Sequence, residues 1–220
     1  MSGRLKLGVL VSGSGSNLQA LLDASARPDF PAEVAVVVSN VPTAFALERA
    51  RRAGVAAVVL EHKAFGSRAE FEKALAEVLE EAGVELVCLA GFMRLLGADF
   101  LARFKGRVLN IHPSLLPAFP GLHAQRQALE HGVKVAGCTV HFVDPGMDTG
   151  PIIAQAAVPV LPGDDEATLS ARILREEHRL YPLVVRLVAE GAVRQEGRRV
   201  VTKTGPAQGE QSLRNPWEPG

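Results

Sequence analysis

The sequence predicts an α/β fold: a doubly wound, mostly parallel sheet with helices on both faces and a partly antiparallel C-terminal half. The first observation is that short runs rich in Val and Leu recur without apolar–polar alternation, which is typical of strands covered on both faces. The second is that amphipathic segments separate these runs, as in a parallel sheet. The third is that 220 residues, 47% of them hydrophobic, suffice to bury one core.

The first half of the chain alternates strands and helices. Strands are expected at residues 5–11, 33–39, 56–60, 85–90 and 107–112. Helical patterns lie at 17–26, 45–53, 67–82 and 94–104. The helix at 67 is the best marked, because Ser67 and Glu70 fit a capping box and Phe71, Leu75 and Leu79 then repeat at helical spacing.

The rhythm changes after residue 112. A Pro-rich loop and a short helix near 123–131 precede two further apolar stretches, 135–143 and 150–160, which we expect to be extra strands of a mixed sheet. A long amphipathic helix then covers 164–190. Asp164 and Asp165 favour its N-terminus, and Pro182 should interrupt and kink it.

These elements predict one domain. We expect a single domain at residues 1–202, with an N-terminal half at about 1–107 and a C-terminal half at about 108–202. Residues 203–220 are polar and rich in Gly and Pro, and we expect a surface tail there.

Charge and cysteine usage point to small-molecule partners in the cytoplasm. Lys plus Arg equals Asp plus Glu at 24 each, without the basic block of a nucleic-acid binder. Cys88 and Cys138 lie in apolar runs without metal-ligand spacing, as expected for reduced thiols. The apolar start is too short for a membrane span and lacks a clear cleavage site. A homodimer is compatible with the sequence.

The stretch SGSGSNL (12–18) follows the first strand and opens the first helix. Free backbone N–H groups at a helix N-terminus attract anions, and Gly13 and Gly15 lack the Cβ atoms that would block their approach. A tight strand-to-helix turn is the alternative interpretation. Dinucleotide binding is disfavoured, because Leu18 replaces the third glycine and the second strand ends in Ser39-Asn40 rather than an acid. There is no triphosphate-cleaving P-loop pattern either, so a phosphomonoester fits best.

Asn110 and His112 end the strand at 107–112. Ligands of doubly wound sheets bind beyond the carboxyl ends of the strands. Side chains alternate along a strand, so Asn110 and His112 should point to the same face there. A polar pair that caps a turn is the alternative.

The segment HFVDPGMDTGP (141–151) supplies Asp144 and Asp148 at the end of another apolar strand. Either carboxylate beside His112 would favour the imidazolium, and this would place a strong donor next to the Asn110 amide. Two donors that converge on one point form an oxyanion hole. The matching reaction is acyl transfer to an amine, with a proton moved afterwards.

Two other chemistries fit less well. Ser114 lies between Pro113 and Leu115 without the GxSxG frame of a nucleophilic hydrolase. A zinc site built from His112, His123 and His141 lacks HExxH or CxxC spacing. We therefore expect no metal, and we treat the histidines other than His112 as structural or surface residues.

Taken together, these motifs resemble the glycinamide ribonucleotide formyltransferases of purine biosynthesis. The resemblance covers nearly the whole chain and rests on SGSGSN (12–17), AGFMRLL (90–96), NIHPSLLPAFPGLHA (110–124), HFVDPGMDTGPII (141–153) and EEHRLYP (176–182). It implies transfer of the formyl group of 10-formyltetrahydrofolate, as co-substrate, to the amine of glycinamide ribonucleotide, without a metal.

The resemblance also implies a role for individual residues. Asn110, His112 and Asp148 would be the catalytic set: His112 as general acid, Asn110 as oxyanion donor and Asp148 as the partner of the histidine. The nucleotide would be bound by Gly15, Ser16, Asn17 and Glu177. Folate would be bound by Arg68, Met93, Arg94, Leu95, Leu96, Asn110, Asp144, Pro145, Gly146, Met147 and Asp148. Without the resemblance, Arg68 reads as a solvated charge, Met93 as core and Glu177 as a polar helix face.

Relatives that share the Asn-x-His and Asp core give two runner-up functions. A tRNA formyltransferase would carry a further basic domain, and a formyltetrahydrofolate hydrolase would carry a regulatory domain ahead of this one, so the length of the chain weakens both. A non-catalytic nucleotide- or folate-binding module is the alternative from another class. Binding alone would not require Asn110, His112 and Asp148 together, and all three are present.

Overall fold

The computed structural model describes residues 3–203 of the chain. Its strands form a seven-stranded sheet in the order β3-β2-β1-β4-β5-β6-β7 and a separate hairpin of β8 and β9. The strands are β1 (Leu5–Val11), β2 (Ala32–Ser39), β3 (Ala56–Val59), β4 (Leu86–Leu89), β5 (Val108–His112), β6 (Val135–Phe142), β7 (Ile152–Pro159), β8 (Val193–Glu196) and β9 (Arg199–Thr202). The helices are α1 (Ser16–Ser25), α2 (Phe45–Arg52), α3 (Arg68–Glu81), α4 (Ala98–Arg103), α5 (Ala124–Glu130) and α6 (Glu166–Ala189), with a 3-10 turn at His62–Ala64.

The pairing of the strands confirms the predicted fold class. Neighbours from β3 through β5 pair in parallel, whereas β6 pairs antiparallel with both β5 and β7. The chain winds outward from β1 toward β3 and then returns to add β4 on the other side of β1. In an open α/β sheet, this switch point is where ligands bind.

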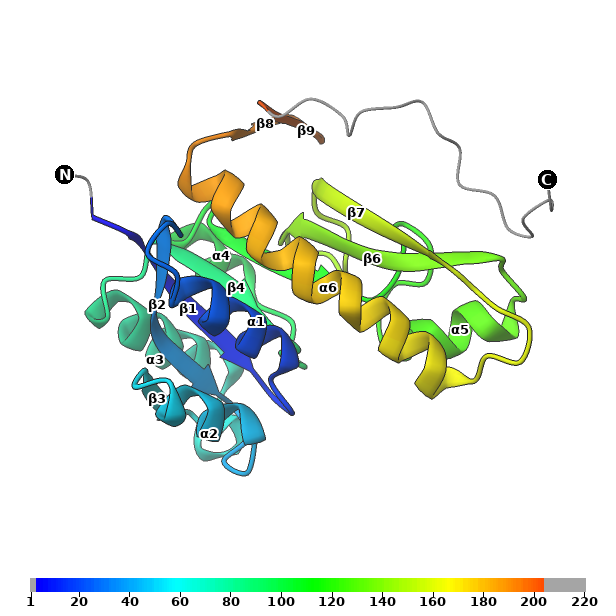
Figure 1. The fold of residues 1–220 in the computed structure, drawn as a ribbon. Helices are drawn as coiled ribbons and strands as arrows, with labels where there is room; N and C mark the ends of the chain where they lie inside the picture. Colours follow the sequence, from blue (N-terminus) through cyan, green and yellow to red (C-terminus); the bar gives the residue numbers. More distant parts are fainter. Residues whose placement is uncertain (1–2, 204–220) are drawn as a thin grey trace.

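Helices cover both faces of the sheet, as Figure 1 shows. Leu7 and Val9 of β1 belong to the buried cluster that includes α1 and α6. Leu10 belongs to the opposite cluster, with Phe71 of α3 and Phe100 of α4. Successive side chains of a strand point to opposite faces of the sheet, and helices cover both faces, so the side chains on both are buried. This explains why the apolar runs of the strands lack polar alternation.

Helix α6 packs along the sheet and contacts α1, β2, β6 and β7. Its Tyr181 is fully buried, and the hydroxyl donates to the carbonyl oxygen of Leu89 at 3.0 Å and lies 3.3 Å from that of Leu109. The helix continues through Pro182, so the predicted interruption does not occur. The buried residues on either side, Tyr181 and Val184, hold it in place although Pro182 has no N–H to donate.

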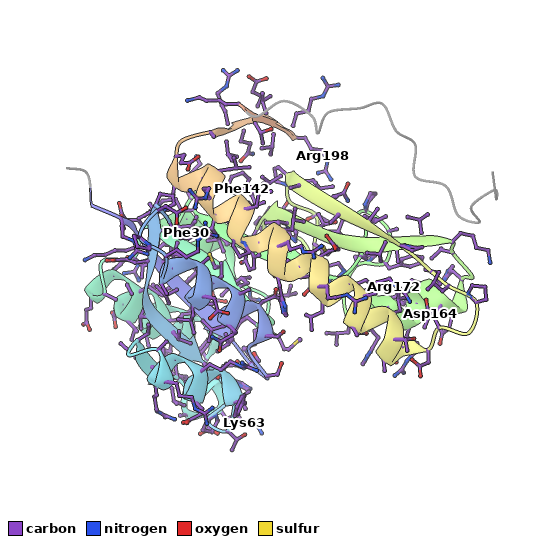
Figure 2. The ribbon with its side chains drawn as sticks, viewed as in Figure 1. Phe30, Lys63, Phe142, Asp164, Arg172 and Arg198 are labelled. Carbon is purple, nitrogen blue, oxygen red and sulfur yellow. The ribbon has the colours of Figure 1, made fainter. Side chains whose placement is uncertain are left out.

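Two helix starts agree with the capping patterns. The Ser67 side chain accepts from the Glu70 N–H at the start of α3. At the start of α6, Asp165 is the cap, and it forms a reciprocal capping box with Thr168. Asp164, one residue earlier, pairs instead with Arg172 at 2.6 Å, and Figure 2 shows both side chains at this end of α6.

The hairpin of β8 and β9 was not expected from the sequence. Its strands are short and largely exposed, and its turn contains Gly197 with φ 60°. The predicted tail at 203–220 lies, apart from residue 203, outside the described residues. Within residues 3–203, no helix is both long and apolar enough to cross a membrane.

Candidate active site

A cavity of about 520 Å³ opens at the carboxyl ends of β4 and β5. This volume lies in the range of small-molecule sites. The cavity walls come from five parts of the chain: the start of α1, the segment after β4, the end of β5 with the following loop, the segment after β6, and α6. The location predicted from the sequence, beyond the carboxyl ends of the strands, therefore coincides with a cavity.

Asn110, His112 and Asp148 come together in this cavity. The Asn110 Nδ2 atom lies 3.4 Å from one carboxylate oxygen of Asp148, and the His112 Nδ1 atom lies 3.4 Å from the other. Asn110 and His112 are alternate residues of β5, which is why both reach the same carboxylate. His112 is 5% exposed, so this contact is screened little by solvent.

The loop after β5 holds the second nitrogen of His112. The Nε2 atom lies 2.9 Å from the carbonyl oxygen of Phe119, which folds back over the strand end with φ 53°. Both ring nitrogens thus face oxygen acceptors, an arrangement that only the doubly protonated ring satisfies in full.

Asp148 sits between several donors. Burial on its own would raise the pKa of Asp148, but a hydrogen bond from His141, the Gly121 N–H at 2.8 Å and the charges of His112 and His141 together lower it below its ordinary value. The carboxylate form is thereby favoured. Asp148 adopts φ 53°, and this uncommon backbone conformation turns its side chain into the cluster.

His141 is a fourth member of the cluster that the sequence did not single out. It is 2% exposed, and its Nε2 atom lies 3.3 Å from Asn110 Nδ2 and 3.7 Å from Asp148 Oδ1. Its Nδ1 atom lies 2.8 Å from the Phe142 carbonyl oxygen. The antiparallel register pairs Asn110 with His141, and a strand alignment of β5 with β6 would have been the signal for it.

Residues 12–18, which we call the anion loop, lie beside this cluster, since Asn17 lines the same cavity. Gly15 precedes α1 with φ 73°, and a Cβ atom there would stand 2.6 Å from the Cβ of Ala46. The Asn17 Nδ2 atom donates to Glu177 at 2.6 Å, and both residues line the cavity. Burial raises the pKa of Glu177, although the Asn17 hydrogen bond opposes this rise. The Oδ1 atom of Asn17 is buried without a partner.

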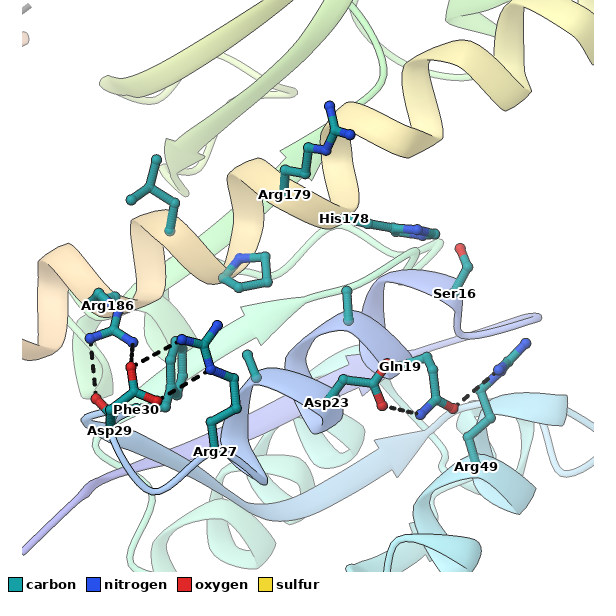
Figure 3. A pocket seen from close by; sticks show the side chains of 14 residues that line it. Ser16, Gln19, Asp23, Arg27, Asp29, Phe30, Arg49, His178, Arg179 and Arg186 are labelled. Carbon is teal, nitrogen blue, oxygen red and sulfur yellow. Dashed lines mark hydrogen bonds and ion pairs between the residues drawn. The ribbon is translucent and has the colours of Figure 1, made fainter. Parts of the chain in front are cut away.

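Ser16 faces a neighbouring groove between α1 and α6, drawn in Figure 3. At the end near Ser16, the groove also carries Arg49 and His178. The groove's other end is closed by Asp29, which pairs with Arg27 and Arg186 at 3.0 and 2.9 Å. Of the predicted nucleotide residues, Asn17 and Glu177 line the cavity and Ser16 lines the groove, whereas Gly15 lines neither and forms the turn before α1.

Most of the predicted folate residues line the cavity: Met93, Arg94, Leu95, Leu96, Asn110, Asp144, Gly146, Met147 and Asp148. Pro145 lies within this loop, between two lining residues. Arg68 does not reach the cavity. It lines a separate hollow and pairs with Glu72 at 2.7 Å. Within residues 3–203, no three His, Cys, Asp or Glu side chains group as metal ligands would.

Comparison with known proteins identifies relatives that match most of the chain. A family model described as formyl transferase matches residues 5–185. The chain is 48% identical over 186 residues to the phosphoribosylglycinamide formyltransferase of Escherichia coli K12, covering 84% of this chain and 88% of that protein. The crystal structure of glycinamide ribonucleotide transformylase 1 from Symbiobacterium toebii superimposes with a TM-score of 0.90 at 60% identity, covering 92% of this chain and 95% of that one.

Longer relatives contain only a similar segment. The chain is 54% identical over 194 residues to the trifunctional purine biosynthetic protein adenosine-3 of Drosophila pseudoobscura pseudoobscura, and it spans 14% of that protein's length. The human protein of the same name is 50% identical over 190 residues, and the chain spans 19% of its length. The family match, the extensive identity and the superposition agree: the chain belongs to the formyl transferase family, among the phosphoribosylglycinamide formyltransferases.

Proposed function

We propose that the chain transfers the formyl group of 10-formyltetrahydrofolate to the amine of glycinamide ribonucleotide, as a step of purine biosynthesis. The observation that carries the proposal is the convergence of Asn110 and His112 on Asp148 inside a cavity that adjoins an anion loop. The names of the E. coli and Symbiobacterium relatives agree with formyl transfer to glycinamide ribonucleotide.

The nucleotide half of the site fits a ribose phosphate. The α1 N-terminus after Gly15 offers N–H groups to the phosphate. Asn17 has a buried carbonyl oxygen without a partner, and Glu177 has a buried carboxyl, so both can accept hydrogen bonds from ribose hydroxyls. Ser16 extends this subsite toward the groove between α1 and α6.

The folate half of the site has apolar side chains at the cavity rim and a hydrogen-bonded loop opposite them. Met93, Leu95 and Met147 are largely exposed at the cavity rim, and a flat heterocyclic ring would cover them. Asp144 stiffens the opposite loop by accepting from Thr149 Oγ1 at 2.6 Å and from the Gly146 N–H at 3.1 Å. Arg68 would have to leave Glu72 to reach a folate carboxylate.

The catalytic roles follow from the hydrogen bonds. When the amine attacks the formyl carbon, the carbonyl electrons move to oxygen, and Asn110 and His112 stabilise that charge by donating to it. His112 then gives a proton to the departing folate nitrogen as its bond to carbon breaks. Asp148 lies 3.4 Å from His112 Nδ1, where it orients the ring, and it receives the proton released by the attacking amine, directly or through water.

An assay with competing acceptors tests the reaction. Glycinamide ribonucleotide, initiator tRNA and water are each offered as acceptors of the formyl group from 10-formyltetrahydrofolate. We expect formylation of the nucleotide alone. Transfer to tRNA or release of formate would favour one of the related enzymes, and binding of both substrates without turnover would favour a binding module.

Replacement of His112 tests the mechanism. In His112→Ala, the oxyanion loses a charged donor and the leaving nitrogen loses its acid, so we expect kcat to fall by about 10³-fold or more. The nucleotide Kd should hold, because Asn17 and Glu177 are untouched. His62→Ala, with the same change at a remote 3-10 turn, is the control. Full turnover in His112→Ala would contradict these roles.

The proposal includes a cytoplasmic location. Cys88 and Cys138 are both buried and unbonded to each other, as suits a reducing compartment.

A further inference from the structure

Thr139 and Gln155 form one row with His112 across the antiparallel part of the sheet. Thr139 of β6 is the register partner of His112 of β5, and Gln155 of β7 is the register partner of Thr139. Partners across strands present their side chains on the same face. Neither Thr139 nor Gln155 lines the cavity, so neither can act on a substrate directly.

The hydroxyl of Thr139 binds the loop at residues 113–121, which follows His112 directly. Thr139 is fully buried, and its Oγ1 donates to the Ser114 carbonyl at 2.7 Å and accepts from the Leu116 N–H at 3.1 Å. A hydroxyl has one hydrogen to donate and two lone pairs. These two contacts leave one lone pair.

Gln155 uses that remaining lone pair. Its Nε2 atom donates to Thr139 Oγ1 at 3.0 Å and also to the Leu116 carbonyl at 2.9 Å. Leu116 is therefore held through its N–H by Thr139 and through its carbonyl by Gln155. Gln155 itself is an exposed residue on the edge strand, so its replacement leaves the core intact.

The same loop supplies two groups to the reacting cluster. The Phe119 carbonyl lies 2.9 Å from His112 Nε2, and the Gly121 N–H donates to Asp148 at 2.8 Å. Ser114 ties the base of the loop to this part, because its hydroxyl donates to the Ala118 carbonyl at 2.6 Å. Hydrogen bonds thus link Gln155 through Thr139 and Ser114 to Ala118. From Ala118 the backbone continues directly into Phe119 and Gly121, which contact His112 and Asp148.

We propose that Gln155 is a positioning residue for formyl transfer, which acts through Thr139 and the 113–121 loop to fix the partners of His112. The inference rests on the proposed role of His112. Its physical basis is preorganisation: donors must stand in place before charge develops, and displacement by about 1 Å costs about 10²-fold in rate.

The test variant is Gln155→Met, which has similar length and lacks the amide. We expect kcat to fall about tenfold, while KM for the nucleotide stays within about twofold, because two hydrogen bonds far from the nucleotide subsite are lost. Amide hydrogen exchange in residues 113–121 should quicken, and exchange in α1 should not change. Gln195→Met is the matched control: Gln195 also lies on an exposed strand and donates to a carbonyl, that of Gly197.

A double-mutant cycle tests the route through Thr139. Thr139→Val removes the hydroxyl, and Gln155→Met in that background should cost less in kcat than it does alone, because one of the two acceptors of Gln155 has already gone. Equal costs in both backgrounds would overturn the route.

Other outcomes are equally decisive. The proposal fails if Gln155→Met keeps kcat within about twofold, or if kcat falls without faster exchange in the loop. If the parent protein shows no formyl transfer, the proposed function fails. In that case, faster loop exchange in Gln155→Met still supports the link between Gln155 and the loop, and unchanged exchange refutes it.

Discussion

At the scale of single residues, the site depends on a carboxylate held between donors. Asp148 faces Asn110 and His112 at 3.4 Å each, distances longer than the roughly 2.7–2.9 Å of a tight charge-assisted hydrogen bond. Neither donor is therefore fully committed to Asp148. Each can share its N–H with a substrate oxygen without losing a strong bond to Asp148, while the Phe119 carbonyl still holds His112 Nε2. This suits an oxyanion hole that also orients a histidine.

Replacement of Asp148 by Asn isolates its charge. The backbone φ of 53° suits Asn as well as Asp, so Asp148→Asn should fold normally. We expect kcat to drop by about 10²- to 10⁴-fold, because an amide cannot take up the proton of the attacking amine or balance positive charge on His112 during transfer. Steady-state kinetics would check this. Asp23→Asn, a change on α1 beside Gln19, should stay near the parent value. A loss of less than about fivefold in Asp148→Asn would contradict the role of the charge.

Glu177 offers a second residue-scale prediction, through pH. Burial raises its folded-state pKa above the unfolded value of about 4.3, so its contribution to stability is complete at low pH and declines as pH rises through the folded pKa. Glu177→Gln cannot ionise. The Tm of Glu177→Gln relative to the parent should therefore increase from about pH 4 upward.

Thermal unfolding of both proteins at a series of pH values from about 4 upward measures this difference in Tm. Cys138, whose pKa burial raises to about 12, stays a neutral thiol throughout and does not interfere. Asp23→Asn again serves as the control, with a Tm difference that should not follow the same course. If the Tm of Glu177→Gln minus the Tm of the parent stayed constant or decreased as pH rises, the raised pKa of Glu177 would be contradicted.

The sequence placed Asn110 and His112 on one face because that step needs only the two-residue period of a strand. Asp148 reaches them only because β6 returns antiparallel to β5, which the sequence alone does not show. The family resemblance assigned Asp148 to the set instead. His141 was left out, because its position opposite Asn110 depends on register, and register between distant strands is not written in either strand alone.

At the scale of elements, local patterns located the strands and most helices, and distant contacts decided the exceptions. Helix α4 begins at Ala98 rather than near 94, because the buried Glu72 of α3 accepts from the Gly97 N–H at 2.9 Å and fixes the start from outside. The β8–β9 hairpin carries little apolar periodicity, so no sequence pattern marked it.

The turn from β1 to α1 gives an element-scale prediction. Gly15→Ala combines a positive φ with a Cβ placed 2.6 Å from that of Ala46. We expect a loss of stability of about 1–3 kcal/mol and weaker nucleotide binding, since the start of α1 must shift. Denaturant unfolding and nucleotide titration would show both.

Gly13→Ala is the matched control for stability. A Cβ at Gly13 meets no atom within 4 Å, and its φ is not positive, so the fold should tolerate it. If Gly15→Ala proved as stable as Gly13→Ala, the conformation of this turn would not be the constraint on the sequence.

At the scale of the whole molecule, α6 joins the half that carries the anion loop to the half that carries the 113–121 loop. Near its start, Glu166 pairs with Arg126 of α5 at 3.0 Å, and near its end Arg186 pairs with Asp29, which follows α1, at 2.9 Å. Between them, Glu177 meets Asn17. The two substrate subsites thus share one rigid element, which supports the proposal that residues 1–202 form one domain.

A single domain of this kind should unfold in one cooperative transition. Leu169 and Val184 are both fully buried, toward opposite ends of α6. Leu169→Ala should cost about 2–5 kcal/mol and Val184→Ala somewhat less, and each should lower the Tm of the entire transition. Calorimetry would show one peak whose calorimetric and van't Hoff enthalpies agree in both variants.

Leu183→Ala, at an exposed leucine of the same helix, should leave the Tm nearly unchanged. If Leu169→Ala split the transition, so that the anion-loop half melted at the parent temperature and the catalytic half melted earlier, the two halves would be separate folding units and α6 would merely bridge them.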